Sequence, residues 1–133
     1  MTTARLSPFT QDPESAPFFA AAREHRLVVR QCLDCGNGIH TPTVHCPFCH
    51  SWNTDWRESN GDARLYSWTT IVHQVHPAFP VPYTIVVVAL EDKPRTHMVG
   101  MLPGQPELRA GMPMKLWFET LDDGVVLPQW QPA

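Results

Sequence analysis

Lysine is scarce in this sequence. Only Lys93 and Lys115 occur among the 133 residues, and ten basic residues stand against 13 acidic ones, which gives a formal net charge of −3. Such a chain has no basic surface that would neutralise a phosphate backbone. Nucleic acid is therefore not an expected partner.

Long hydrophobic runs are also missing. The longest, Ile85 to Leu90, is far shorter than the roughly 20 residues that a membrane-spanning helix needs. No secretory leader pattern precedes the cysteines, and a reducing compartment disfavours disulfides. We therefore expect a soluble, cytoplasmic protein with no membrane partner.

Patterns of nucleophilic catalysis and phosphate binding are absent as well. None of the serines lies in a Gly-x-Ser-x-Gly turn, no glycine-rich phosphate loop occurs, and neither lysine lies in a clearly apolar stretch. The sequence thus predicts no catalytic residue.

Cysteine is rare, but its placement is specific. Cys32, Cys35, Cys46 and Cys49 form two Cys-x-x-Cys pairs and are the only four cysteines in the chain. Two such pairs joined by a short loop predict a closed tetrahedral site for a structural Zn²⁺. Iron in a rubredoxin-type site uses the same ligand set, so both metals stay open.

Fourteen prolines interrupt the chain too often for long helices. A short helix is predicted from Ser15 to about His25, since Phe18, Ala21 and Ala22 recur at helical spacing. Strands at 27–31, 38–42 and 53–58 would form the metal ribbon. We therefore divide the chain into an N-terminal tail and helix (1–26), a zinc ribbon (27–58) and a barrel (59–133).

Beyond the Asn60-Gly61 turn the pattern changes to a β meander. One long strand is expected to place Leu65, Ser67, Thr69, Ile71, His73 and Val75 on one face. Further strands are predicted at 83–91, 95–102, 114–120 and 125–130, with burial of 85–90 on both sides, a helical turn at 107–111, and Pro128 confining the last strand to an edge or bulge. The expected fold class is mostly β: an N-terminal helix, a rubredoxin-like zinc ribbon and a five-stranded OB-fold barrel.

Seven segments, in this order, resemble the zinc-ribbon/OB-fold family known as domain of unknown function 35. The match covers roughly residues 14–131, and the segments are Pro17–Ala22, Leu27–Cys32, Cys35-Gly36, Cys46-Pro47, Leu65–Thr69, Pro82-Tyr83 and Gly111–Met114. The resemblance implies a small, non-catalytic subunit that works in a hetero-oligomer with a thiolase-like large subunit on an acyl-CoA substrate. The partners of such proteins are thiolases, acyltransferases and the aldolases, carbon–carbon lyases, that cleave steroid side chains in lipid metabolism.

Several side chains are candidates for contact with the substrate, a CoA thioester, or with the partner. The aromatic rings exceed what a small barrel core needs, and arginines suit CoA phosphates. The candidates are Trp68, His73, His76, Phe79, Tyr83, Arg64, Arg109 and Trp130. Two other functions stay open: a single-stranded nucleic-acid-binding protein, since OB barrels and zinc ribbons both serve that task, and a stand-alone acyl-CoA-binding module.

Overall fold

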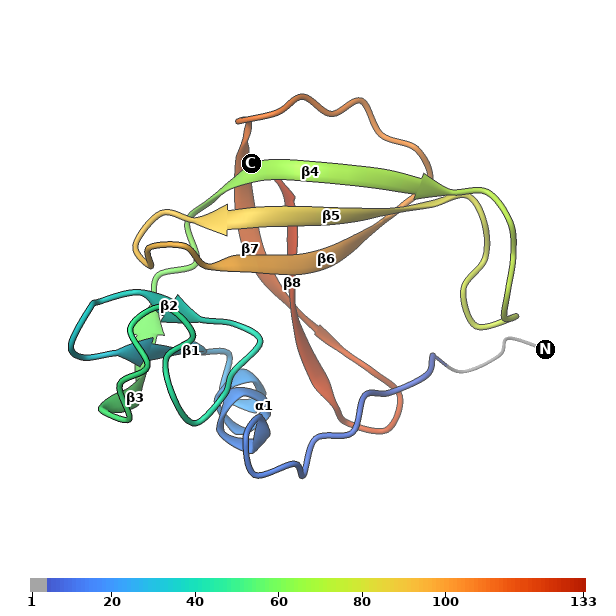
Figure 1. Cartoon of the computed structure of the whole chain (residues 1–133). Coiled ribbons are helices and arrows are strands. Elements are labelled where there is room, and N and C mark those ends of the chain that lie inside the picture. The colour runs from blue at the N-terminus through green and yellow to red at the C-terminus, as the bar shows by residue number, and fades with distance from the viewer. Residues whose placement is uncertain (1–4) are drawn as a thin grey trace.

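The computed structural model describes residues 5–133, so residues 1–4 of the predicted N-terminal tail lie outside the described residues. One helix is followed by a three-stranded sheet of order β2-β1-β3 and a five-stranded sheet of order β6-β5-β4-β7-β8, all pairs antiparallel (Figure 1). The elements are α1 (Ala16–Arg23), β1 (Leu27–Cys32), β2 (Gly38–Ile39), β3 (Thr54–Ser59), β4 (Ala63–Ile71), β5 (Tyr83–Leu90), β6 (His97–Pro103), β7 (Pro113–Thr120) and β8 (Val126–Pro132). The mostly-β prediction is confirmed.

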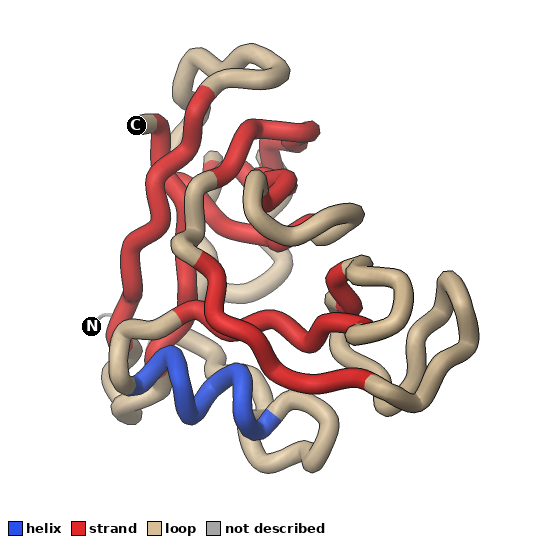
Figure 2. Tube along the Cα trace, turned by 90° about the vertical axis from the view of Figure 1, so that its left-hand side faces the viewer, coloured by secondary structure: helices blue, strands red, loops and turns tan. Residues whose placement is uncertain are grey.

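The helix α1 begins after Ser15 and ends two residues before His25. A proline in the first turn suits its start, because the missing N–H is unpaired there anyway. Ala21 and Ala22 are buried, and the helix packs on β1 and β8. Figure 2 shows it beside the three-stranded sheet. No helix among the described residues is long and apolar enough to cross a membrane.

The ribbon and the barrel share one hydrophobic core. Leu27 and Val29 of β1 are 2% and 0% exposed and belong to the same cluster as Leu65, Val86 and Val88 of the larger sheet. Burial of such side chains is the main favourable term in folding. The metal-bearing part is therefore packed onto the barrel and is not a separate appendage.

The linker between ribbon and barrel is fixed by Gly61 and Trp130. Gly61 has φ +81°, and a Cβ at this position would collide with Leu116, so only glycine fits. The Trp130 indole Nε1–H donates to the Gly61 carbonyl at 3.1 Å, and the ring is 1% exposed. Trp130 is thus a core residue, and its assignment to a substrate or partner surface is wrong.

The strand β4 is shorter than predicted and changes face along its length. A bulge at Tyr66 shifts the register, so that Leu65 pairs with Val88 but Ser67 pairs with Val87. Leu65 and Ser67 therefore do not share a face. The strand ends at Ile71, and the following residues lie in a loop where the side chains of Val72 and Val75 are 74% and 86% exposed.

Three other predictions have mixed outcomes. In β5 the burial alternates, with Val86 and Val88 fully buried and the intervening side chains half-buried, so burial on both sides is wrong. Residues 107–111 form no helical turn, because Gly111 and Met112 instead exchange backbone hydrogen bonds with Leu65. The strand β8, which contains Pro128, is an edge strand as expected.

Candidate functional site

The four cysteines converge on one point at the tip of the ribbon. Their Sγ atoms all lie within 4.8 Å of one another, with Cys32–Cys49 at 3.5 Å and Cys35–Cys46 at 3.6 Å. Four thiolates around a metal at about 2.3 Å have edges near 3.8 Å, whereas a disulfide has S–S near 2.05 Å. The cluster could therefore hold one tetrahedral metal ion.

Backbone N–H groups point at two of these sulfurs. Cys35 N donates to Cys32 Sγ at 3.4 Å, and Phe48 N donates to Cys46 Sγ at 3.3 Å. The Cys35 N–H is the main cause that lowers the pKa of Cys32 to about 7. Burial alone would raise the pKa of Cys46, but the N–H groups of Cys49 and Phe48 outweigh it and the pKa is lowered. The two turns favour the thiolate form that a metal requires.

A third thiol, that of Cys49, shows the effect of crowding among the sulfurs. The Ser51 N–H acts to lower the pKa of Cys49, but the neighbouring Cys32 thiol and burial oppose it and raise the pKa to about 12. A cation placed among the sulfurs would remove this mutual opposition between thiolates. Cys32 and Cys46 are fully buried, and with four sulfur donors the coordination shell is closed, which suits a structural role.

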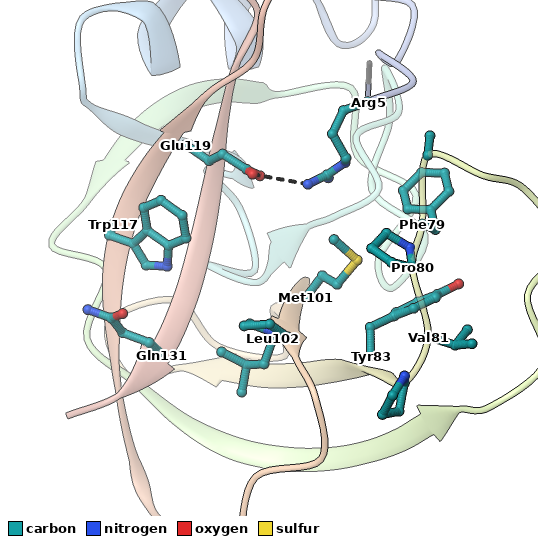
Figure 3. A pocket seen from close by; sticks show the side chains of 13 residues that line it. Arg5, Phe79, Pro80, Val81, Tyr83, Met101, Leu102, Trp117, Glu119 and Gln131 are labelled. Atoms are coloured by element: carbon teal, nitrogen blue, oxygen red, sulfur yellow. Dashed lines mark hydrogen bonds and ion pairs between the residues drawn. The ribbon is translucent and has the colours of Figure 1, made fainter. Parts of the chain in front are cut away.

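A second feature is an apolar cavity of about 610 Å³ between the loop before β5, the end of β6, and the strands β7 and β8 (Figure 3). One wall is the segment Ala78–Tyr83, and another is Met101–Pro103. Trp117 and Gln131 complete the opposite side, where Figure 3 shows the indole directed toward Met101. Pockets of this size accept small organic ligands.

A chain of polar contacts closes one end of the cavity. Arg5 Nη1 donates to Glu119 Oε2 at 3.0 Å, and Gln129 Nε2 donates to Glu119 Oε1 at 3.1 Å. Gln129 Oε1 in turn accepts the Met101 N–H at 2.8 Å, so the side chain bridges the edge strands β8 and β6. The guanidinium of Arg5 also lies over the Phe79 ring at 5.4 Å.

The structure brings three of the predicted surface residues together. Phe79 and Tyr83 both line the cavity, with ring centroids 6.1 Å apart. His76 adjoins them, since its ring lies 6.4 Å from Phe79 and its Nδ1 accepts the Ala78 N–H at 3.0 Å.

Four other candidates lie apart from this cavity. His73 is exposed in the loop after β4, and Trp68 on β4 is 39% exposed. Arg64 donates to Glu91 at 2.6 Å, and Arg109 is exposed in the segment before β7. None of the four is among the residues that line the cavity.

Sequence reasoning missed Arg5 and Glu119. They are 114 positions apart and pair only because the N-terminal segment crosses the end of β7. No local pattern marks such a pair. Trp117 carried a weak signal, because it alternates with the core residues Leu116 and Phe118 and so faces away from the core.

Two family models match the chain in the order of its parts. The rubredoxin-like zinc ribbon domain of ChsH2 matches residues 19–54, and its C-terminal OB-fold domain matches residues 56–119. A solved chain titled "Ltp2-ChsH2(DUF35) aldolase" is 32% identical, with a TM-score of 0.80, over 94% of this chain and 98% of that chain. The protein belongs to the ChsH2 family. The predicted zinc-ribbon/OB-fold architecture is confirmed.

Two further proteins are similar to this chain. A DUF35 protein of unknown function from Sulfolobus solfataricus shares the fold at 18% identity, with a TM-score of 0.61 over 78% of this chain and 77% of that chain. A curated relative from Thermomonospora curvata, "Probable enoyl-CoA hydratase alpha subunit", is 37% identical over 123 residues, which are 90% of this chain and 38% of the relative. This chain thus spans little more than a third of that relative's length.

Proposed function

We propose that this protein is a non-catalytic accessory subunit of a thiolase-superfamily enzyme that acts on an acyl-CoA. The observation that carries the proposal is the match, over nearly the full length of both chains, to the ChsH2 chain of an aldolase. A second relative is named as a subunit of an acyl-CoA enzyme, which supports the same substrate class. The reaction proposed for the partner is aldol cleavage, with acyl transfer as the alternative outcome.

The described residues support the non-catalytic part of the proposal. All four thiols lie in the cysteine cluster, and Lys93 is buried with its Nζ 3.8 Å from Asp92. His76 is the histidine nearest the cavity rings, and its Nδ1 is occupied by a backbone N–H. Acyl-CoA chemistry needs a nucleophile or base paired with oxyanion donors, and such a set is not found among residues 5–133.

Exposed apolar side chains support an assembly. Val72, Val75, Tyr66 and Val99 are each more than 60% exposed on or beside β4 and β6. Large apolar side chains exposed to this degree mark candidate protein interfaces. We propose that the thiolase-like subunit covers part of this area and shares its acyl-CoA site with this chain.

The proposed metal is Zn²⁺, held by Cys32, Cys35, Cys46 and Cys49 as a structural ion. The sulfur spacing and the N–H groups directed at the sulfurs fit four thiolates around one ion. Elemental analysis of the reduced protein distinguishes zinc from iron, which fits the same donors.

Co-expression with a tagged thiolase-like protein from the same genome tests the assembly. The expected result is a complex that survives affinity purification and gel filtration. A matched pair of variants locates the contact: Val99→Asp is expected to break the complex, and Val44→Asp, at an exposed position of the ribbon, to preserve it. A thiolase-like protein that never retains the chain, under conditions in which both are folded, would reject the proposal.

A further inference from the structure

The cavity beside Arg5 combines a wide apolar wall with a charged end formed by Arg5 and Glu119. We propose that it binds a neutral, apolar ligand that carries an oxygen acceptor, and that Arg5 is the side chain that recognises this oxygen. This inference deepens the proposed function, on which it rests for the identity of the natural ligand, since the acyl end of a thioester has this chemistry.

The walls of the cavity select for apolar groups. Ten of the 13 lining residues are Ala, Phe, Pro, Val, Tyr, Met, Leu or Trp, and three prolines of the segments 80–82 and 103 stiffen two of its sides. The Phe79 and Trp117 rings offer flat surfaces on opposite sides, as Figure 3 shows. A volume of about 610 Å³ lies within the range of drug-sized ligands.

The charges of the cavity select for a neutral ligand. Among residues 5–133, Arg5 and Glu119 are the only charged residues that line the cavity, and they form an ion pair at 3.0 Å. The second Glu119 oxygen accepts a hydrogen bond from Gln129. Because the two charges balance, the cavity offers no net attraction to a phosphate group. The nucleotide end of CoA does not fit this site, whereas an acyl group does.

One donor of Arg5 is buried and has no partner. Its Nη1 pairs with Glu119, but its buried Nε–H has no partner, the one such side-chain nitrogen or oxygen among residues 5–133. A buried donor without an acceptor costs about 1–3 kcal/mol. A ligand oxygen would satisfy this N–H once the guanidinium turns toward the cavity. The Phe79 ring, 5.4 Å below the guanidinium, holds Arg5 at the cavity wall.

Methyl NMR of the full-length, zinc-loaded protein tests the site with two probes, 2-acetylnaphthalene and 2-ethylnaphthalene. They differ by one carbonyl oxygen. Met101 lines the cavity, whereas Met98 and Met114 are 1% and 3% exposed in the core and serve as internal references. Both probes are expected to shift the Met101 methyl signal and leave the reference signals in place, with the ketone binding more tightly.

Two variant pairs assign the effect. Arg5→Lys keeps the charge opposite Glu119 but lacks the Nε–H, so ketone affinity should fall about tenfold or more, while the hydrocarbon stays within about twofold. Val81→Trp should fill the cavity and abolish both shifts, while Val99→Trp, on an exposed β6 position outside it, should not.

Each opposite result overturns a stated part of the proposal. A Met101 signal that neither probe moves would remove the site, and equal ketone affinity for wild type and Arg5→Lys would remove the role of Arg5. The protein alone is measured, so failure to assemble with a thiolase-like subunit would reject the proposed function and leave the binding result standing.

Discussion

Gln129 connects three elements through one side-chain amide. It is 5% exposed, accepts the Met101 N–H and donates to Glu119, and it thereby joins β8 to β6 where the two sheet edges meet. The side-chain amide acts as acceptor through its oxygen and as donor through its nitrogen. The barrel is closed here by a side chain, in place of a backbone ladder between β6 and β8.

Replacing Gln129 by leucine should destabilise the protein. The change leaves the Met101 N–H without its acceptor, and an unsatisfied buried donor costs about 1–3 kcal/mol. Urea unfolding measures the free energy of unfolding. Gln131→Leu is the control, since Gln131 is exposed and should shift stability by no more than about 0.5 kcal/mol. Equal stability of the two variants would contradict the bridging role.

His40 should make the stability of the protein depend on pH. Its ring packs against Phe18 at 5.6 Å, and burial lowers the pKa of His40 below its ordinary value. The unfolded chain therefore takes up this proton at a higher pH than the folded chain does, so the free energy of unfolding falls as the pH drops below about 6.5. With zinc in excess, thermal unfolding followed between about pH 7.5 and pH 5.5 should lose more stability in wild type than in His40→Gln. Parallel curves would contradict this assignment.

Prediction at the residue scale succeeded where the signal was local and failed where it was not. The spacing of Cys32, Cys35, Cys46 and Cys49 is enough to place four sulfurs together, because each pair closes its own turn. Arg5 and Glu119 meet only through the path of the N-terminal segment. Trp130 illustrates a different failure, because composition counts aromatic rings but does not show which ring the core encloses.

At the scale of the element, Gly61 determines how the ribbon joins the barrel. Gly61→Ala should be destabilising for two reasons: φ is +81°, and the new methyl group meets Leu116. Gly124→Ala is the matched control, since φ is +87° there but no atom lies within 4 Å of the added Cβ. The cost at Gly61 should exceed the cost at Gly124 by about 1 kcal/mol or more in urea unfolding. Equal losses of unfolding free energy in the two variants would mean that the Leu116 side chain moves aside without cost.

The elements themselves were predicted largely by alternation and by turn residues. The starts of β1, β3 and β5 agree with the sequence pattern to within one residue, because the apolar runs end at turn or metal-binding residues. The bulge at Tyr66 could not be predicted from the sequence pattern. One extra residue in β4 changes the face of every later side chain, but the residue types on either side of it give no sign of the change. The side chains after the bulge were consequently assigned to the wrong face.

At the scale of the whole molecule, the metal should stabilise the barrel as well as the ribbon. Structural zinc contributes directly to folding free energy, and β1 carries both Cys32 and the core residues Leu27 and Val29. Cys46→Ser should lose bound metal and lower the free energy of unfolding by several kcal/mol. His45→Gln is the control and should retain the metal, since His45 lies beside the cluster but is not among its four donors.

Hydrogen exchange shows how far that effect extends. In Cys46→Ser, amides of β5 should exchange faster along with those of β1, because one core joins the two sheets. Faster exchange confined to the ribbon, with β5 protected as in wild type, would show that the two sheets unfold independently.

The central claim is that this chain lends structure and a binding surface to an enzyme whose reactive groups lie elsewhere. Acyl-CoA turnover by the purified chain, by its thiolase-like partner, and by the assembled complex tests this claim most directly. The account predicts no turnover by the chain alone and a higher rate for the complex than for the partner alone. Turnover by the chain alone, or a partner whose rate does not change when the chain is bound, would contradict it.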